Sequence, residues 1–431
     1  MAAGIRELNL AGAGRQPARH QFLMTCNAAC VRICCESPMK RTPYLTKCSN
    51  LAALAAIIFI SSLPIYGQSA LPVADSRQFN LLVLGDSIPW GQGLRDEHKA
   101  WYLVRTWLEE TGGWQVRERI EAHSGAVIGS VGDSGADPIP PLNGEVSRGV
   151  PSVNGQIDNA VRSYADPGKV DLVLVDGCIN DLDARRLLNA ANATAGIREL
   201  AQQKCGPPVE ALLGRITAAF PNAHVIVTGY YPILSERTAN DFFMRSLAKR
   251  LYTGSAPMND QQLRSRLVEI SREWYQTSNQ MLAAATEKAD AQLVARGSRQ
   301  RAMFAEVGFL PEHSFASPQS RLWGFDASAI RKALVIVTLG RVTLNTNDER
   351  RSQRSASCND ILRRPAGETK EQKSSRENRL MQCRLAAIGH PNRKGAQMYA
   401  DAINQQLKIL ISSPGWLRDR GITAALGNPV K

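Results

Sequence analysis

Strand-like runs alternate with helix-like segments through most of the chain, and this alternation restricts the fold more than any other feature. Apolar or alternating runs that suit strands lie at 79–84, 116–125, 170–177, 223–232 and 303–308, with a further candidate at 333–344. Segments with helical patterns lie at 101–110, 211–220, 258–296 and 395–410. Strands that alternate with helices predict a mostly parallel central sheet covered on both faces, which is a three-layer α/β/α fold.

The N-terminal part of the chain has the pattern of an export signal. Residues 51–63 are apolar, basic residues precede them, and Pro64 and Gly67 follow. Such a segment is typical of a secretory signal peptide, and its apolar run is shorter than the roughly 20 apolar residues of a transmembrane helix. Because Met39 opens an ordinary basic n-region, we expect 1–38 to be an extension upstream of the true start and 39–70 to be the signal peptide. The mature protein is then secreted or periplasmic.

The mature chain, 71–431, is expected to form one domain with insertions at about 235–300 and 345–383. The second of these is rich in charge and poor in apolar residues, which is typical of solvated surface. Four of the nine cysteines lie in the mature chain, and an even number in an exported protein permits two disulfides. Pairing by proximity gives Cys178–Cys205 and Cys358–Cys383; the alternative is buried thiols.

The charge of the chain restricts its partners. The formal net charge is +13, and residues after 70 carry 45 Lys and Arg against 37 Asp and Glu. This moderate excess favours contact with anionic surfaces. The basic residues are scattered without interleaved aromatics, so we expect no nucleic-acid partner. We also expect a monomer. No histidine pair has the HExxH spacing of a zinc site, so we expect no metal and no cofactor.

A Gly-Asp-Ser turn follows the first predicted strand and ends at Ser87. A serine hydroxyl becomes an effective nucleophile when it is exposed, has a neighbouring base and faces donors for the developing oxyanion. The same three residues recur at 132–134, so the surroundings must decide between the two copies. The sequence around Ser134 is similar to the nucleophile loop of chymotrypsin-like proteases, but that fold is a β-barrel and the upstream elements here predict α/β.

Four segments occur in a fixed order along the chain. The turn at 85–87 is followed by Gly125 after the second predicted strand, by GCIND at 177–181 after the third, and by HPNRKG at 390–395 before the last helix. This order resembles the four sequence blocks of the SGNH/GDSL hydrolases, over roughly 79–232 and 385–410. The resemblance implies a flavodoxin-like SGNH hydrolase fold for 71–431 and a serine esterase activity.

The resemblance also implies a role for each matching residue. Ser87 would attack the ester and form an acyl intermediate, with His390 as general base. The oxyanion hole would consist of the backbone N–H groups of Ser87 and Gly125 and the side-chain amide of Asn180, and loss of one donor costs about 2.7–4 kcal/mol. Asp86 and Asp181 are expected to support their loops through hydrogen bonds.

The block around His390 departs from the family pattern D-x-x-H, because Ala387 stands where the family has the acidic residue. Three alternatives follow. The backbone carbonyl of Ala387 orients the imidazole, a carboxylate such as Asp360 reaches it from the insertion held by Cys358–Cys383, or the enzyme is impaired. A carbonyl can fix the tautomer, but it adds no negative charge to stabilise the imidazolium.

The substrate expected from these residues is a small-molecule or lipid ester. A thioesterase or an acyltransferase would use the same residues, and the missing acid points to a further alternative, a non-catalytic binding protein at the cell envelope. Structural roles are also possible for single residues. His390 could cap a helix, and Trp90, Tyr230 and Tyr231 could be ordinary core. The functional alternative for these three aromatic residues is an apolar pocket, and His123 could line the cleft.

Overall fold

The computed structural model of the chain describes residues 78–129, 144–145, 147, 149–240, 242–324, 358–359 and 362–412. All of them lie in the second of the two units into which the chain divides, Ala70–Lys431. The predicted extension and signal peptide, the strand candidate at 333–344, Ser134 and Asp360 lie outside the described residues.

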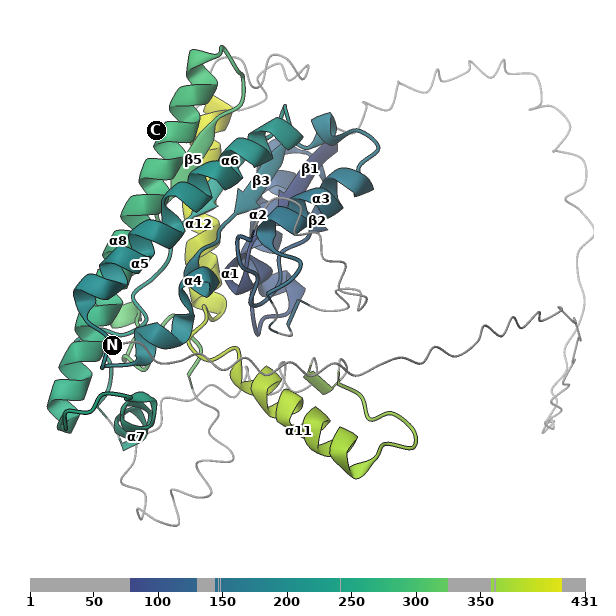
Figure 1. Cartoon of the computed structure of the whole chain (residues 1–431). Helices are drawn as coiled ribbons and strands as arrows, with labels where there is room; N and C mark the ends of the chain where they lie inside the picture. Colours follow the sequence, from purple (N-terminus) through teal and green to yellow (C-terminus); the bar gives the residue numbers. More distant parts are fainter. Residues whose placement is uncertain are drawn as a thin grey trace, which may run out of the picture. The chain divides into compact units, whose positions relative to one another are not determined.

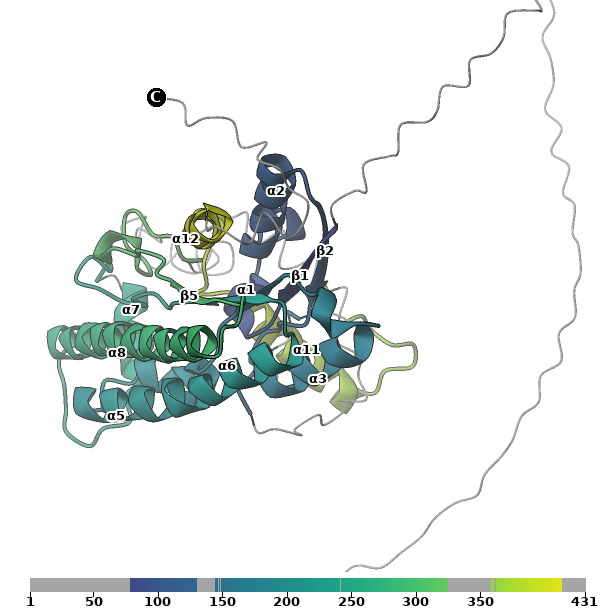
Figure 2. The same cartoon turned by 90° about the horizontal axis from the view of Figure 1, so that it is seen from above.

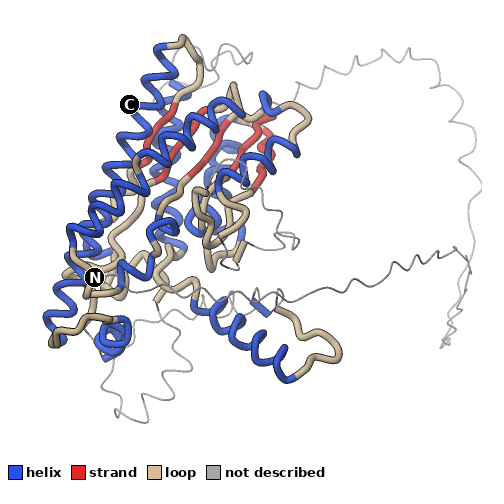
Figure 3. Tube along the Cα trace, viewed as in Figure 1, coloured by secondary structure: helices blue, strands red, loops and turns tan. Residues whose placement is uncertain are grey.

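Five strands form one parallel sheet (Figure 1, Figure 3). They are β1 (Gln78–Val83), β2 (Gln115–Ile120), β3 (Leu172–Val175), β4 (His224–Thr228) and β5 (Ala302–Ala305). Their order is β2-β1-β3-β4-β5, and each neighbouring pair is parallel. This is the flavodoxin-like strand order, in which the direction of the crossovers reverses between β1 and β3. The predicted parallel sheet is therefore confirmed.

The apolar runs of the sequence form the central strands. Every residue of β3 and of β4 is buried, since helices cover both faces of the sheet there. The edge strand β2 instead has charged residues between its apolar Val116 and Ile120, and only Val116 is buried. It ends at Ile120, five residues earlier than the strand expected at 116–125, and the chain then enters the loop that contains Gly125.

Helices form the two outer layers, as the view from above shows (Figure 2). One face is covered by α2 (Ala100–Gly112) and α12 (Arg393–Ser412). The other is covered by α3 (Val153–Ser163), α5 (Thr194–Cys205), α6 (Pro207–Ala219) and α8 (Asp260–Ala295). The architecture is thus the expected three-layer α/β/α fold.

Shorter elements lie in the connections. The short helices are α1 (Ser87–Trp90), α4 (Ile179–Leu182) and α7 (Phe242–Leu251), and the 3₁₀ turns are η1 (Asp96–His98), η2 (Pro167–Lys169), η3 (Ala184–Leu188) and η4 (Pro311–His313). Among the described helices, none is long and apolar enough to cross a membrane.

The segment 235–300, expected as an insertion, contributes a covering helix. Its α8 begins at a capping box formed by Asn259 and Gln262 and packs against α5, α6 and β5. The charged segment 345–383 contains α11 (Lys370–Leu385), whose described side chains are mostly exposed. A small apolar cluster of Cys358, Leu362 and Cys383 accompanies this helix.

Both predicted disulfides are present. Cys178 is bonded to Cys205, and Cys358 is bonded to Cys383. The first bond links the residue before α4 to the last residue of α5. It therefore anchors the short helix that carries Asn180 to a longer helix of the outer layer.

Replacing Cys178 and Cys205 together by alanine should lower the free energy of unfolding by about 3 to 4 kcal/mol, because the bond closes a loop of 27 residues. Urea denaturation without reductant measures this loss. Peptide mapping of the unreduced wild-type protein is the control, and four unbonded thiols there would contradict both disulfides.

Candidate active site

The nucleophile candidate Ser87 is the first residue of α1, and a short turn, 84–86, connects it to β1. The turn before it needs glycine: Gly85 has φ +122°, and a Cβ there would lie 2.3 Å from Asp176 Oδ1. The Gln156 side chain of α3 holds this glycine from both sides. Gly85 N–H donates to Gln156 Oε1 at 2.7 Å, and Gln156 Nε2 donates to the Gly85 carbonyl at 2.9 Å.

Asp86 supports the turn, as the sequence predicted. One carboxylate oxygen, Oδ1, caps α1 by accepting the N–H of Ile88 at 2.9 Å, and Oδ2 accepts the hydroxyl of Tyr230 at 3.3 Å. The N–H of Asp86 donates to Asp176 Oδ1 at 3.0 Å. Burial raises the pKa of Asp86 to about 6. Burial, and next the charge of Asp86, raise the pKa of Asp176 well above its usual value.

The base candidate His390 lies beside Ser87, although 303 residues separate them. His390 Nε2 is 2.8 Å from Ser87 Oγ. The cap of α12 is made by Asn392, whose Oδ1 accepts the N–H groups of Lys394 at 3.0 Å and Gly395 at 3.1 Å. The alternative that His390 itself caps this helix is therefore wrong.

A short backbone pairing holds His390 in place. Trp323 N–H donates to the His390 carbonyl at 2.7 Å, and Gly389 N–H donates to the Trp323 carbonyl at 3.0 Å. The hydroxyl of Tyr231, in the segment after β4, donates to the Gly389 carbonyl at 2.8 Å. Neither support could be predicted from the sequence: Trp323 lies outside every motif, and Tyr231 was expected only as a pocket or core residue.

An apolar cluster joins the serine and histidine segments. Leu94, Trp323, Ala387 and Ala396 pack together, and Trp323 and Ala387 are fully buried. Leu94 belongs to the loop that follows α1, and Ala387 stands three residues before His390. This cluster therefore fixes the two sides of the site relative to each other.

The three oxyanion-hole candidates come from neighbouring loops. Gly125 has φ +82°, a conformation that suits glycine, and it lies in the loop after β2. Asn180 Nδ2 donates to the carbonyl of Ala126 at 2.9 Å. This amide has two N–H groups, so one remains for a substrate. Within the described part of the chain, the N–H groups of Ser87 and Gly125 donate no hydrogen bond.

Asp181 connects the same two loops. Its carboxylate accepts the N–H of Ile128 at distances of 3.0 and 3.2 Å. Together with the bond from Asn180 to Ala126, this contact ties α4 to the Gly125 loop. The predicted supporting role of Asp181 is confirmed.

The group that orients His390 stays a prediction. Ala387 is fully buried, and its carbonyl accepts the backbone N–H of His390 at 3.0 Å. A carbonyl oxygen has two lone pairs, so this bond leaves capacity for a second donor. Asp360 lies outside the described residues.

His123 does not line the site. Its side chain is 1% exposed, and its two ring nitrogens lie 3.1 Å from the Ser124 carbonyl and 2.7 Å from the Pro151 carbonyl. Tyr230 and Tyr231 are also buried, and each donates a hydrogen bond through its hydroxyl. These three residues belong to the framework of the site.

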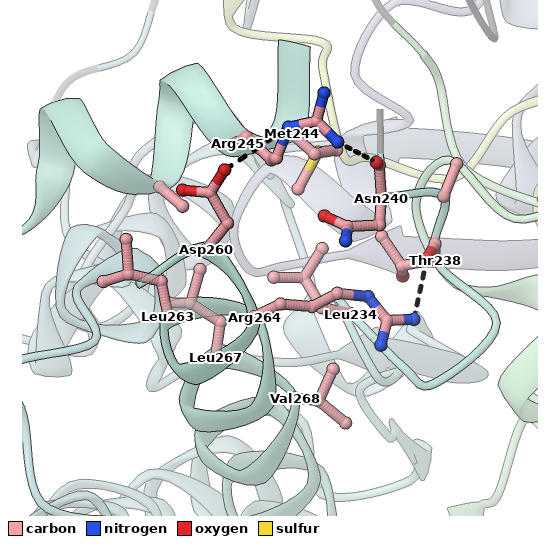
Figure 4. Close-up of a pocket in the computed structure, with 12 residues that line it drawn as sticks. Leu234, Thr238, Asn240, Met244, Arg245, Asp260, Leu263, Arg264, Leu267 and Val268 are labelled. Carbon is pink, nitrogen blue, oxygen red and sulfur yellow. Dashed lines mark hydrogen bonds and ion pairs between the residues drawn. The ribbon is translucent and has the colours of Figure 1, made fainter. Parts of the chain in front are cut away.

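A separate pocket lies between α7 and α8 (Figure 4). Its apolar lining includes Leu234, Leu263 and Leu267, and ion pairing between Arg245 and Asp260 at 3.5 Å crosses its edge. None of the predicted site residues lines it. Among the described residues, no group of three or more His, Cys, Asp or Glu side chains is arranged to hold a metal ion.

The chain resembles the SGNH/GDSL hydrolases in its strand order and in the order of its four motif segments. No family model and no curated protein matches it. Among solved structures, it is similar to an extracellular lipase from Streptomyces rimosus, with 15% identity over 76% of this chain and 99% of the lipase, at a TM-score of 0.38. It is also similar to a phospholipase A1 from Streptomyces albidoflavus NA297, with 13% identity over 76% and 98% at a TM-score of 0.37, and to an aryl esterase from M. smegmatis, with 13% identity over 77% and 99% at 0.31.

Gly395 offers a test of the packing behind His390. A Cβ at this position would lie 2.4 Å from the Arg321 carbonyl oxygen, so Gly395→Ala should lower the free energy of unfolding by about 1–3 kcal/mol. Gly214 is the matched control: it is an exposed glycine inside α6 with nothing near its Cβ position, and Gly214→Ala should raise that free energy by about 0.5–1 kcal/mol. Urea denaturation compares them. Equal effects would show that the close approach is unimportant.

Proposed function

We propose that this protein is an exported serine esterase, which hydrolyses carboxylic esters through an acyl intermediate on Ser87. The observation that carries the proposal is the 2.8 Å contact between His390 Nε2 and Ser87 Oγ. Ser87 stands at the start of α1, after the turn that follows the buried strand β1, and His390 lies in the turn before α12. Nucleophile and base at hydrogen-bond distance are the arrangement that serine hydrolysis requires.

Each step of the reaction uses one of the described groups. His390 Nε2 takes the proton of Ser87 as Oγ attacks the acyl carbon. The N–H groups of Ser87 and Gly125 and the amide of Asn180 stabilise the oxyanion. The tetrahedral species collapses, and His390 gives the proton to the departing alcohol. Water then attacks the acyl-serine with His390 again as base, which releases the acid and restores Ser87.

The proposed export has its own support. The two disulfides, Cys178–Cys205 and Cys358–Cys383, are features of proteins that mature in an oxidising compartment. The basic and apolar pattern of residues 39–70 is consistent with such a route.

The assignment of the nucleophile is tested by three single alanine variants and one double variant. Ser87→Ala and His390→Ala should each abolish hydrolysis of p-nitrophenyl esters, and the double variant should be hardly worse than either single one, because nucleophile and base act as a unit. Ser134→Ala, the variant in the second Gly-Asp-Ser copy, should remain active and should still react covalently with a fluorophosphonate. Full turnover by Ser87→Ala, or labelling that persists in it, would refute the assignment.

The partner of His390 is tested by a single change at Asp360. If the Ala387 carbonyl orients the imidazole, Asp360→Asn should keep most of its kcat. If Asp360 supplies the charge, the same change should lower kcat by a factor on the order of 10⁴, the loss that follows when a triad aspartate becomes asparagine. We expect the first result, because Ala387 already adjoins His390. Circular dichroism of the variant separates a lost charge from a lost fold.

A further inference from the structure

Two carboxyl groups are buried directly behind the nucleophile. Asp86 is 0% exposed and Asp176 is 2% exposed, and they follow the ends of the adjacent strands β1 and β3. The N–H of Asp86 donates to Asp176 Oδ1, and the same oxygen occupies the space where a Gly85 side chain would be. The Asp176 carboxyl therefore lies against the turn that presents Ser87. The mechanism above uses neither of its oxygens.

The two carboxyls receive different numbers of donors. Asp86 accepts hydrogen bonds at both oxygens, from Ile88 N–H and from the Tyr230 hydroxyl. Asp176 accepts one bond at Oδ1, whereas its Oδ2 is buried and has no hydrogen-bond partner in the described part of the chain. Burying an oxygen without a hydrogen-bond partner costs far more when the carboxyl is charged than when it is a neutral acid. This difference favours the negative charge on Asp86 and the neutral acid at Asp176.

The side chains around the pair supply no positive charge. Asp181 of α4 contributes a further negative charge, and the Tyr230 hydroxyl contacts Asp86 from the segment after β4. Burial, and next the charges of Asp86 and Asp176, raise the pKa of the neighbouring Tyr231. On α12, the Tyr399 hydroxyl donates to the Gly229 carbonyl, and the neutral Gln156 amide holds Gly85 from α3. The backbone of His123 contacts the Gly85 carbonyl from the segment after β2, with its ring nitrogens near other carbonyl oxygens. Among the described residues, no Lys or Arg forms an ion pair with Asp86 or Asp176.

We propose that Asp176 is a positioning residue for Ser87 that acts only in its protonated form, so that loss of its proton at alkaline pH displaces the nucleophile turn and stops hydrolysis. This proposal rests on the proposed esterase function. Its physical basis is that two neighbouring buried carboxyls cannot both carry a charge without strong repulsion, so the pair retains one proton. The repulsion would act on the backbone of Asp86, which is bonded directly to Ser87.

The direction of the pH effect follows from the same burial. Burial raises the pKa of both carboxyls, and the charge of Asp86 raises the pKa of Asp176 further. A carboxyl whose pKa is higher in the folded state than in the unfolded state stabilises the fold while it is protonated. That contribution is lost as the pH rises from the unfolded-state pKa through the folded-state pKa. Alkaline pH therefore weakens the turn and the fold together.

The test replaces the acid with its neutral mimic. Asp176→Asn keeps the shape of the protonated carboxyl and an oxygen that can accept the Asp86 N–H, but it cannot ionise. At pH 7 its kcat on a p-nitrophenyl ester should stay within about threefold of wild type, with KM unchanged, and the alkaline fall in kcat should move upward or vanish. Asp176→Ala removes the acceptor, so its kcat should fall by about 10- to 100-fold, the cost of a misplaced reacting group. High activity in Asp176→Asn together with low activity in Asp176→Ala, and the shift of the alkaline fall in kcat, would distinguish positioning from a merely structural role.

Asp171→Asn is the matched control. Asp171 is also buried, at 3% exposed, and also accepts a backbone N–H, that of Asn80 at 2.7 Å, but it precedes β3 at the opposite end of the sheet. This variant should show the same fall in kcat at alkaline pH as the wild-type protein. The proposal would be overturned if Asp176→Asn lost activity at the same alkaline pH as the wild-type protein. It would also be overturned if Asp171→Asn shifted this fall in kcat as far as Asp176→Asn does.

Two further measurements keep the proposal testable if the esterase function fails or a variant does not fold. The gain in unfolding free energy of Asp176→Asn over wild type should grow between pH 5 and pH 9, and it needs no turnover. In the wild-type protein, the infrared absorption of a protonated carboxyl should persist at pH 7. A pH-independent difference in stability, or the absence of that absorption, would overturn the proposal. Absence of both turnover and fluorophosphonate labelling would instead refute the esterase.

Discussion

The parallel pairing of β1 with β3 is the constraint on which the rest of the site depends. Leu81, Leu82 and Val83 pair with Leu172, Val173 and Leu174, so the chain leaves both strands at the same edge of the sheet. This register brings the turn with Ser87 next to the segment with Asp176 and Asn180. A shift by one residue would turn the buried side chains of β3 to the opposite face and separate these groups.

The other half of the site is built on backbone contacts rather than on the sheet. His390 stands in a turn that pairs with Leu322 and Trp323, and the Tyr231 hydroxyl and the Leu94–Trp323–Ala387 cluster support it. Three segments far apart in the sequence must therefore dock before the imidazole reaches Ser87. The two halves of the site are stabilised by different interactions, the first by strand pairing and the second by local packing.

The sequence predicted the strands better than the helices. Each expected run from 79–84 to 303–308 contains a strand. The signal was clearest for β3 and β4, because a strand buried on both faces is apolar at nearly every position. The helix α3 escaped notice, because it buries the polar side chains of Asn154 and Gln156, which interrupt the apolar spacing of a helix. Both disulfide pairs were correct. Ser87, Gly125, Asn180 and His390 were singled out from motif order, whereas the supporting residues Asp176, Tyr231 and Trp323 have no signature in sequence, since their roles exist only after distant segments meet.

The separation of 303 residues between Ser87 and His390 has a consequence for the order of assembly. A chain synthesised from its N-terminus completes the sheet, the serine turn and the Asn180 loop long before the last helix exists. Closing a loop of this length adds an entropic cost that grows only logarithmically, so α12 can dock late without a large penalty. Until it docks, the serine has no base beside it. Under the proposed mechanism, a partly made or truncated chain would therefore be inactive, and turnover would begin only once α12 has docked.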